Sequence, residues 1–299
     1  MKYNNVLLLL APLKAWSRQC ICGYANQHDG ASVLPEQADT HAEAISQDRQ
    51  QGSTDEHSQS AAAAGNGKQT GPQEYPFIAA VVYKSEPRGT PCAGAIIDEH
   101  HVLIAAHCVN GVRADDVGVY AGSNRFNATG AKLETVMVIH NHPQWDPERL
   151  VYDISLLQLQ DSLTFDGHST GAVCVLDHLE HIDNQKAVAV AWDSTWDGGQ
   201  AVSPLLQATF ETHDLASCSA RPSGGPQFCA YGTEPAECQD AFEGPVLLWQ
   251  NPGSRRYSVL GISSYGRSCR QAPEIVTDTT QLTPWMQSVL RTDGGRLCE

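Results

Sequence analysis

The sequence is short of basic residues, of long apolar runs and of the paired cysteine motifs that bind zinc. Lys and Arg number 19 against 34 Asp and Glu, a formal net charge of −15 at neutral pH. That charge repels phosphate backbones and anionic lipids, so no nucleic-acid partner is expected. No segment reaches the roughly 20 apolar residues of a membrane-spanning helix, so no membrane partner is expected either. Without zinc-type C-x-x-C pairs, we expect neither a metal nor a cofactor.

The cysteines and the N-terminus both indicate secretion. Ten cysteines in 299 residues fit a disulfide framework, which persists in oxidising compartments. The apolar run Val6–Leu13 follows a short polar start, and Ala15 and Ser17 are small residues of the kind that signal peptidase requires. Pro12 disfavours the alternative of a buried N-terminal helix. We therefore predict a signal peptide over residues 1–17, cleaved after Ser17, and an extracellular location.

The amino-acid composition of the chain changes after residue 75. Residues 18–65 are polar and acidic with few bulky apolar side chains, which predicts a disordered leader. Short strand-like runs between turn residues then follow at 78–83, 102–106, 117–120, 133–139, 154–159, 187–192, 205–210, 246–250 and 257–262. This spacing predicts an all-β barrel or sandwich. A helix is expected only over 283–290, with Thr283 as its N-cap and Pro284 at the first helical position.

Four motifs occur in one order along the chain. They are Cys92-Ala93-Gly94 leading to Ala105-Ala106-His107-Cys108, then Tyr152-Asp153-Ile154, then Cys238-Gln239 with Gly244-Pro245, and finally Ser263-Ser264-Tyr265-Gly266. They resemble the catalytic-histidine, catalytic-aspartate, nucleophile and substrate-strand blocks of the trypsin/chymotrypsin family of serine proteases. The resemblance implies a trypsin-like domain over 66–292 and a C-terminal tail at 293–299. Its fold would be two six-stranded antiparallel β-barrels, over about 76–183 and 184–280, with a C-terminal helix.

Within this resemblance the general base and its partner are present, but the nucleophile is not. His107 matches the base, Asp153 the carboxylate that orients it, and Ser264 the residue that hydrogen-bonds that carboxylate. The nucleophilic serine falls on Phe242, whose side chain has no hydroxyl to attack a carbonyl. Asp240 replaces the glycine of the oxyanion hole, and a carboxylate there opposes the charge of the transition state. The resemblance therefore implies an inactive homologue, a pseudoprotease, and not an enzyme.

The activation switch and the specificity pocket are also altered. Ala241 replaces the Asp that pairs with the new N-terminus of an activated zymogen, and residues 63–67, where the activation junction would lie, contain no basic residue and no Ile-Val pair. The base of the specificity pocket falls on Ala236, with Glu237 beside it, and a wall position that is usually glycine falls on Glu274. We expect a plugged or polar pocket.

The histidines are expected to have structural roles or none. With no nucleophile, His107 and Asp153 are expected to persist as a buried hydrogen-bonded pair. Four other histidines occur in two close pairs, but no cysteine or carboxylate stands at the spacing of a metal ligand, so no metal site is expected there. We therefore expect surface histidines at His100, His101, His140 and His142.

The resemblance also implies most of the disulfides. It pairs Cys92 with Cys108, Cys218 with Cys229, and Cys238 with Cys269, and it implies a bond from Cys174 to Cys20 or Cys22 in the leader, with Cys298 unassigned. Asn127-Ala128-Thr129 is an acceptor sequence for N-glycosylation, usable if the chain is secreted.

Three functions are compatible with the sequence. The first is a secreted, non-catalytic binding or regulatory protein, whose partner would be an extracellular protein such as a protease or zymogen of a proteolytic or immune cascade. The second is a residual serine-type endopeptidase-like hydrolase that uses another nucleophile near His107. The third is an inert carrier. Of these we expect the first.

Overall fold

The computed structural model describes residues 21–26, 68–85, 90–126, 132–192, 204–218, 224–233, 244–269 and 272–298. The predicted signal peptide and most of the predicted leader lie outside these ranges. In the described part of the chain, no helix is long and apolar enough to span a membrane.

The first half of the domain is a closed six-stranded antiparallel barrel with the order β2-β3-β4-β7-β6-β5. Its strands are β2 (Ile78–Tyr83), β3 (Cys92–Ile96), β4 (His101–Ile104), β5 (Val117–Tyr120), β6 (Leu133–Asn141) and β7 (Ser155–Leu159). Two 3-10 helices, η1 (Ala106–Val109) and η2 (Ala114–Asp116), lie between β4 and β5.

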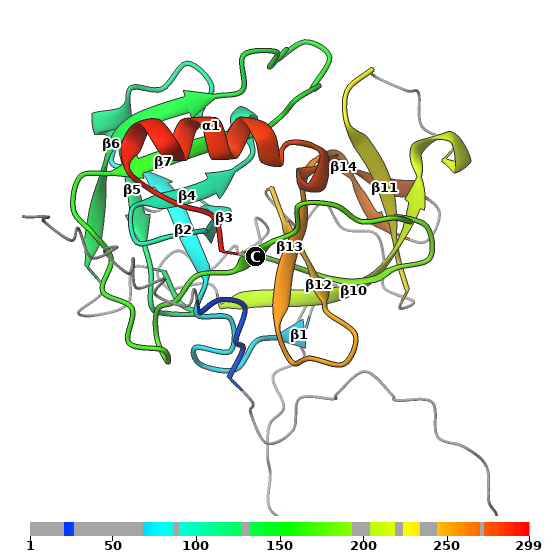
Figure 1. Cartoon of the computed structure of the whole chain (residues 1–299), viewed down its shortest axis with the longest axis horizontal. Coiled ribbons are helices and arrows are strands. Elements are labelled where there is room, and N and C mark those ends of the chain that lie inside the picture. The colour runs from blue at the N-terminus through cyan, green and yellow to red at the C-terminus, as the bar shows by residue number, and fades with distance from the viewer. Residues whose placement is uncertain are drawn as a thin grey trace, which may run out of the picture.

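The second half is another antiparallel barrel, with the order β9-β10-β11-β14-β13-β12, which closes through pairing of β12 with β9. Its strands are β9 (Lys186–Trp192), β10 (Leu205–Asp214), β11 (Gln227–Gly232), β12 (Val246–Gln250), β13 (Tyr257–Cys269) and β14 (Ala272–Asp278). The short β1 (Lys68–Gln69) pairs with β10, and β8 (Cys174–Val175) runs parallel to β13. The 3-10 helices η3 (Leu215–Ser217) and η4 (Thr279–Gln281) follow β10 and β14. The predicted fold of two six-stranded barrels is confirmed, and Figure 1 shows the two barrels side by side.

The barrels share one hydrophobic core. Its buried members include Phe77 of the first barrel, Trp192 of the second, and Met286 and Leu290 of the C-terminal helix. A smaller cluster around Phe210 fills the second barrel. Because burial of a large apolar side chain is worth about 1.5–3 kcal/mol, this shared core fixes the two barrels against each other.

The helix α1 (Thr283–Asp293) begins one residue earlier than predicted. The predicted N-cap, Thr283, is the first helical residue, and Leu282 occupies the cap position without a side-chain hydrogen bond. The hydroxyl of Thr283 instead donates to the carbonyl of Leu176, 3.0 Å away. Gly294 ends the helix in the left-handed conformation, with φ of 81°. The helix lies over the first barrel (Figure 1).

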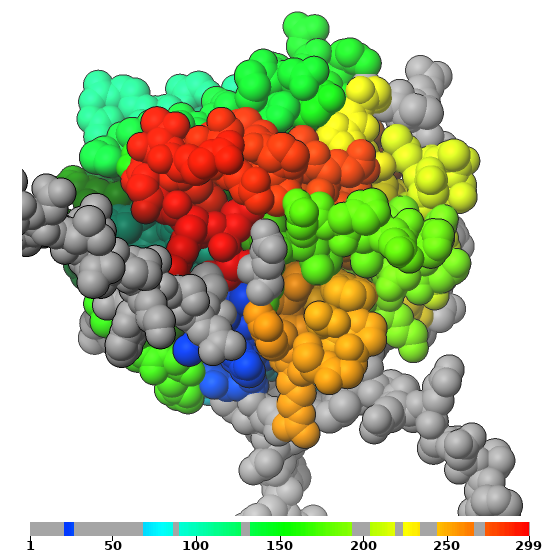
Figure 2. Space-filling model, viewed as in Figure 1, coloured from blue at the N-terminus to red at the C-terminus, as the bar shows by residue number. Residues whose placement is uncertain are grey.

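Residues 21–26 of the predicted disordered leader lie on the surface of the folded domain, which corrects that prediction for this segment. In Figure 2 they fill a space beside the hairpin of β12 and β13. The amide of Gly23 donates to Ala172, and the amide of Tyr257 donates to Gly23, at 2.8 and 2.7 Å. A Cβ atom on Gly23 would lie 2.3 Å from the carbonyl oxygen of Tyr257, so only glycine permits this approach.

Candidate functional site: a histidine–aspartate pair

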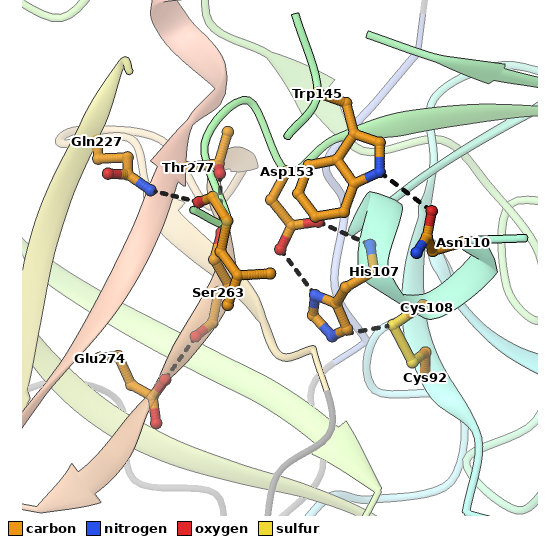
Figure 3. Close-up of polar contacts among 12 residues, drawn as sticks. Cys92, His107, Cys108, Asn110, Trp145, Asp153, Gln227, Ser263, Glu274 and Thr277 are labelled. Atoms are coloured by element: carbon orange, nitrogen blue, oxygen red, sulfur yellow. Dashed lines mark hydrogen bonds and ion pairs between the residues drawn. A yellow bond between two sulfur atoms is a disulfide. The ribbon is translucent and has the colours of Figure 1, made fainter. Parts of the chain in front are cut away.

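His107 and Asp153 form the hydrogen-bonded pair that the sequence predicts. His107 lies in η1, directly after β4, and Asp153 lies in the loop that leads into β7. One carboxylate oxygen accepts from the backbone amide of His107 at 2.8 Å, and the other lies 2.7 Å from Nδ1 of its ring. Asp153 is fully buried, whereas 27 % of the His107 side chain is exposed. Figure 3 shows the ring between the carboxylate and a disulfide.

The loop before Asp153 holds the carboxylate in place. Tyr152 adopts a left-handed backbone conformation, with φ of 53°, and its carbonyl accepts from the amide of Ile154 at 2.8 Å. The ring of Tyr152 stacks on the imidazole of His142 with 4.7 Å between centroids, and Trp285 of α1 meets the same imidazole edge-on. A positive φ is unfavourable for a residue with a side chain, so this packing compensates a local strain. The sequence carries no signal for this arrangement.

The pair has the geometry of a general base. Asp153 fixes the Nδ1–H tautomer of His107, which leaves Nε2 as the proton acceptor. Sγ of Cys108 lies 3.5 Å from Nε2. That sulfur is bonded to Cys92 and has no proton to give.

Ser264 was expected to hydrogen-bond Asp153, and the structure gives it a different partner. Its hydroxyl lies 3.0 Å from that of Thr277, across the β13–β14 pair. Both side chains are buried, so this contact satisfies two hydroxyl groups that water cannot reach. Within the described residues, the polar contacts of Asp153 are those from His107.

Glu274 is the one residue of the predicted specificity pocket within the described ranges. It lies on β14 with only 5 % of its surface exposed, and the hydroxyl of Ser263 on β13 donates to its carboxylate. A carboxylate is buried only where hydrogen bonds compensate its lost hydration. Glu274 is therefore an acidic side chain held inside the wall of β13 and β14, as Figure 3 shows.

The other altered positions lie outside the described residues. These are Ala236, Glu237, Asp240, Ala241 and Phe242, together with the glycosylation sequon at Asn127. Their identities are those of the sequence, and their roles stay predictions.

The structure joins Cys92 to Cys108 and Cys218 to Cys229, the two pairs that the resemblance implies. It also selects between the two leader cysteines, because Cys174 is bonded to Cys22. The predicted bond between Cys238 and Cys269 rests on side chains outside the described part of the structure. Cys298 is disulfide-bonded as well.

Two of the four histidines expected on the surface are buried. His101 is completely inaccessible, and His142 is 7 % exposed between Tyr152 and Trp285. Burial lowers the pKa of His142 below its usual range. His100 is exposed, and His140 is partly exposed. The sequence could not reveal this, because all four residues of β4 are buried, and His101 is covered by Asp293 and Gly295, which lie far away in the sequence.

The described chain contains one group of three close metal-ligand types, Cys92, His107 and Cys108. Both sulfurs are bonded to each other in the disulfide, whereas a cysteine must be a free thiolate to bind a metal ion. This group therefore does not suit a metal ion.

The two barrels, with the histidine–aspartate pair carried between β4 and β7, define the class of chymotrypsin-type serine proteases and their homologues. The sequence matches the Trypsin family over residues 64–286. The chain belongs to the trypsin family.

Similar proteins come from insects and mammals. The chain is 27 % identical over 234 residues to Venom serine protease 34 of Apis mellifera, which covers 74 % of this chain and 57 % of the bee protein. It is 27 % identical to Trypsin epsilon of Drosophila erecta, over 67 % of this chain and 78 % of the fly protein. Chymotrypsin-like elastase family member 1 of Homo sapiens is also 27 % identical, over 75 % of this chain and 91 % of the human protein. The chain thus spans little more than half of the bee relative.

Proposed function

We propose that this chain is a secreted, non-catalytic serine protease homologue that binds and regulates an extracellular protein, such as a protease or a zymogen. The observation that carries the proposal is Phe242 at the nucleophile position, beside an intact pair of His107 and Asp153. A general base without a nucleophile cannot form an acyl-enzyme. The named relatives are proteases. This chain therefore differs from them in the sequence around Phe242 and not in its fold.

Two further substitutions support the loss of chemistry. Asp240 introduces a negative charge where the oxyanion would form, and loss of one oxyanion donor alone costs about 10²–10³-fold in rate. Ala241 removes the carboxylate that would receive a new N-terminus after activation. Restoring a serine at position 242 alone would therefore not be expected to restore activity.

Secretion is supported by the disulfides and the predicted signal peptide. Cys92–Cys108, Cys218–Cys229 and Cys22–Cys174 require an oxidising compartment to form. The third of these ties residues 21–26 to the second barrel across 152 positions of sequence. The leader would stay attached to the domain after a cut elsewhere within it.

The competing function is a residual hydrolase, and one observation favours it. Nδ1 of His107 lies 2.7 Å from Asp153, so the base is oriented as a working enzyme would need. A general base in this orientation activates a hydroxyl or water that is brought to its Nε2. The same geometry also serves a structural pair, because the carboxylate is buried and both its oxygens are satisfied.

Turnover of a broad fluorogenic peptide library separates the two. The purified, disulfide-bonded protein is expected to give no turnover above that of its His107→Ala variant, while an active trypsin at the same concentration serves as positive control. Turnover that disappears in His107→Ala would overturn the proposal. Affinity capture from the secreting fluid, with the protein immobilised, tests the binding half. A saturable protein partner is expected, and the absence of any would favour the inert carrier.

A further inference from the structure

The disulfide between Cys22 and Cys174 lies against the guanidinium group of Arg256, the residue directly before β13. Nη2 of this arginine lies 2.7 Å from Sγ of Cys22 and 2.9 Å from Sγ of Cys174. Its Nε donates to the backbone carbonyl of Cys22 at 3.1 Å. One positive charge therefore contacts both sulfurs of a single bond, at a place that the histidine–aspartate pair does not include.

Contacts that do not involve sulfur hold Arg256 in this place. Its backbone forms an antiparallel bridge with Tyr24, and its guanidinium carbon lies 6.0 Å from the centre of the Tyr24 ring. Its carbonyl accepts from the amide of Asn251 at 3.0 Å, across the hairpin of β12 and β13. Because the planar guanidinium is already oriented, little side-chain entropy is lost when it binds a charged sulfur.

The two redox states of this bond differ in what they offer to Arg256. A disulfide sulfur is neutral and a weak hydrogen-bond acceptor, whereas a thiolate carries a full negative charge. Hydrogen bonds between charged partners are about twice as strong as those between neutral ones, and a neighbouring arginine favours the thiolate form of a cysteine. The guanidinium therefore stabilises the reduced state more than the oxidised state. A disulfide whose reduced form is stabilised is easier to reduce.

The other two disulfides between described cysteines have different neighbours. Sγ of Cys108 lies 3.5 Å from Nε2 of His107, and Sγ of Cys218 lies 3.3 Å from the carbonyl oxygen of Asp214. Neither neighbour is a guanidinium or an ammonium group, and a carbonyl oxygen repels a thiolate. Within the described ranges, these two bonds are therefore internal references for a bond that lies beside a fixed positive charge.

We propose that the Cys22–Cys174 bond is a redox-sensitive tether, which a dithiol reductant opens while the other two bonds stay closed. A thiolate of the reductant attacks Sγ of one cysteine, the S–S bond breaks, and the other sulfur leaves as a thiolate that faces Arg256. The second thiol of the reductant then attacks the mixed disulfide and releases the first cysteine. The reductant ends as a disulfide, oxidised by two electrons. Its two thiol protons pass to the two cysteine sulfurs, or to water where the thiolate beside Arg256 persists.

The segment that carries the tether lies at the surface. Both cysteines are buried, but Ile21 and Tyr24 on either side of the bond are 74 % and 55 % exposed. Figure 2 shows residues 21–26 on the surface beside the hairpin of β12 and β13. Local opening of this short segment is therefore enough to expose the sulfurs. After reduction, the segment is held by backbone hydrogen bonds such as those of Gly23 and Tyr257, so it detaches from the second barrel more readily.

Equilibration of the full chain in graded mixtures of reduced and oxidised dithiothreitol, followed by alkylation and peptide mass mapping, tests the tether. In the parent, Cys22–Cys174 should be half reduced in a more oxidising mixture than the other two bonds. The matched variants are Arg256→Gln and Arg255→Gln, and Arg255 is the exposed arginine next to it. Arg256→Gln should lower the equilibrium constant for reduction by about tenfold, or about 30 mV, since it removes a hydrogen bond to a charged group. Arg255→Gln should change that constant by less than about twofold.

The direction of the change separates this proposal from a purely structural role of Arg256. If the arginine only held Cys22 through its carbonyl, losing it would loosen the segment and make the bond easier to reduce. Easier reduction in Arg256→Gln, or equal constants in the two variants, would therefore overturn the proposal. If Arg256→Gln does not fold, the parent alone decides, because a Cys22–Cys174 bond no easier to reduce than the other two would refute the tether. In the selectively reduced parent, hydrogen exchange at the amides of Gly23 and Tyr257 should be faster, and unchanged exchange would contradict the opening.

Discussion

Replacing Asp153 with alanine should destabilise the folded protein, although we expect the protein to have no catalytic activity. The carboxylate is fully buried and receives both the backbone amide and Nδ1 of His107, at 2.8 and 2.7 Å. Removing one partner of a buried pair costs about 3–5 kcal/mol. The His107 ring is 27 % exposed, so water can take over part of the lost contact, and we expect about 3 kcal/mol.

Guanidinium denaturation followed by tryptophan fluorescence measures this loss, since the chain has six tryptophans. With a slope of roughly 2–6 kcal/mol per molar guanidinium, the midpoint should fall by roughly 0.5–1.5 M. Asp153→Asn keeps an acceptor for the backbone amide and should lose about half as much. The exposed Asp177→Ala is the control, expected within about 0.5 kcal/mol of the parent. If Asp153→Ala behaves like that control, the pair has no structural role.

Three further predictions concern the leader and the buried histidine. Replacing both Cys22 and Cys174 with alanine should cost about 2–5 kcal/mol in thermal unfolding, because the bond closes a loop of 152 residues; an unchanged melting temperature would contradict this. Gly23→Ala should weaken the backbone contacts of residues 21–26 around the intact disulfide, seen as faster hydrogen exchange at the amide of Tyr257, since its Cβ would overlap that residue's carbonyl; unchanged exchange at this amide would contradict the prediction. Burial lowers the pKa of His142, so the unfolded chain takes the proton first and the parent should lose stability as pH falls below 6.5; His142→Phe should abolish that loss, and an identical acid profile would refute it.

The fold was predictable because its strands carry local signals. The predicted runs at 78–83, 117–120 and 246–250 coincide with β2, β5 and β12. The strands β11 and β14 were not predicted as runs. β14 contains Pro273 and ends in the polar residues Thr277 and Asp278, and its strand conformation depends on pairing with both β11 and β13.

The sequence predicts which residues form the site, but it does not predict all of the contacts that those residues make. The pairing of His107 with Asp153 follows from motif resemblance, as do two disulfides. The choice of Cys22 as the partner of Cys174 depends on the backbone contacts of Gly23, and the partner of Ser264 depends on the β13–β14 register. The burial of His101 depends on the end of α1 and the residue Gly295 after it, which lie against its ring. Such three-dimensional placements have no local sequence pattern.

The most direct test of the non-catalytic assignment is covalent labelling with a serine-reactive phosphonate, read out by intact mass. The purified protein is expected to gain no adduct under conditions in which an active trypsin is labelled completely, since Phe242 offers no nucleophile. A stoichiometric adduct on the native protein, lost in His107→Ala, would show that another residue has taken over the nucleophile's role and would contradict the account.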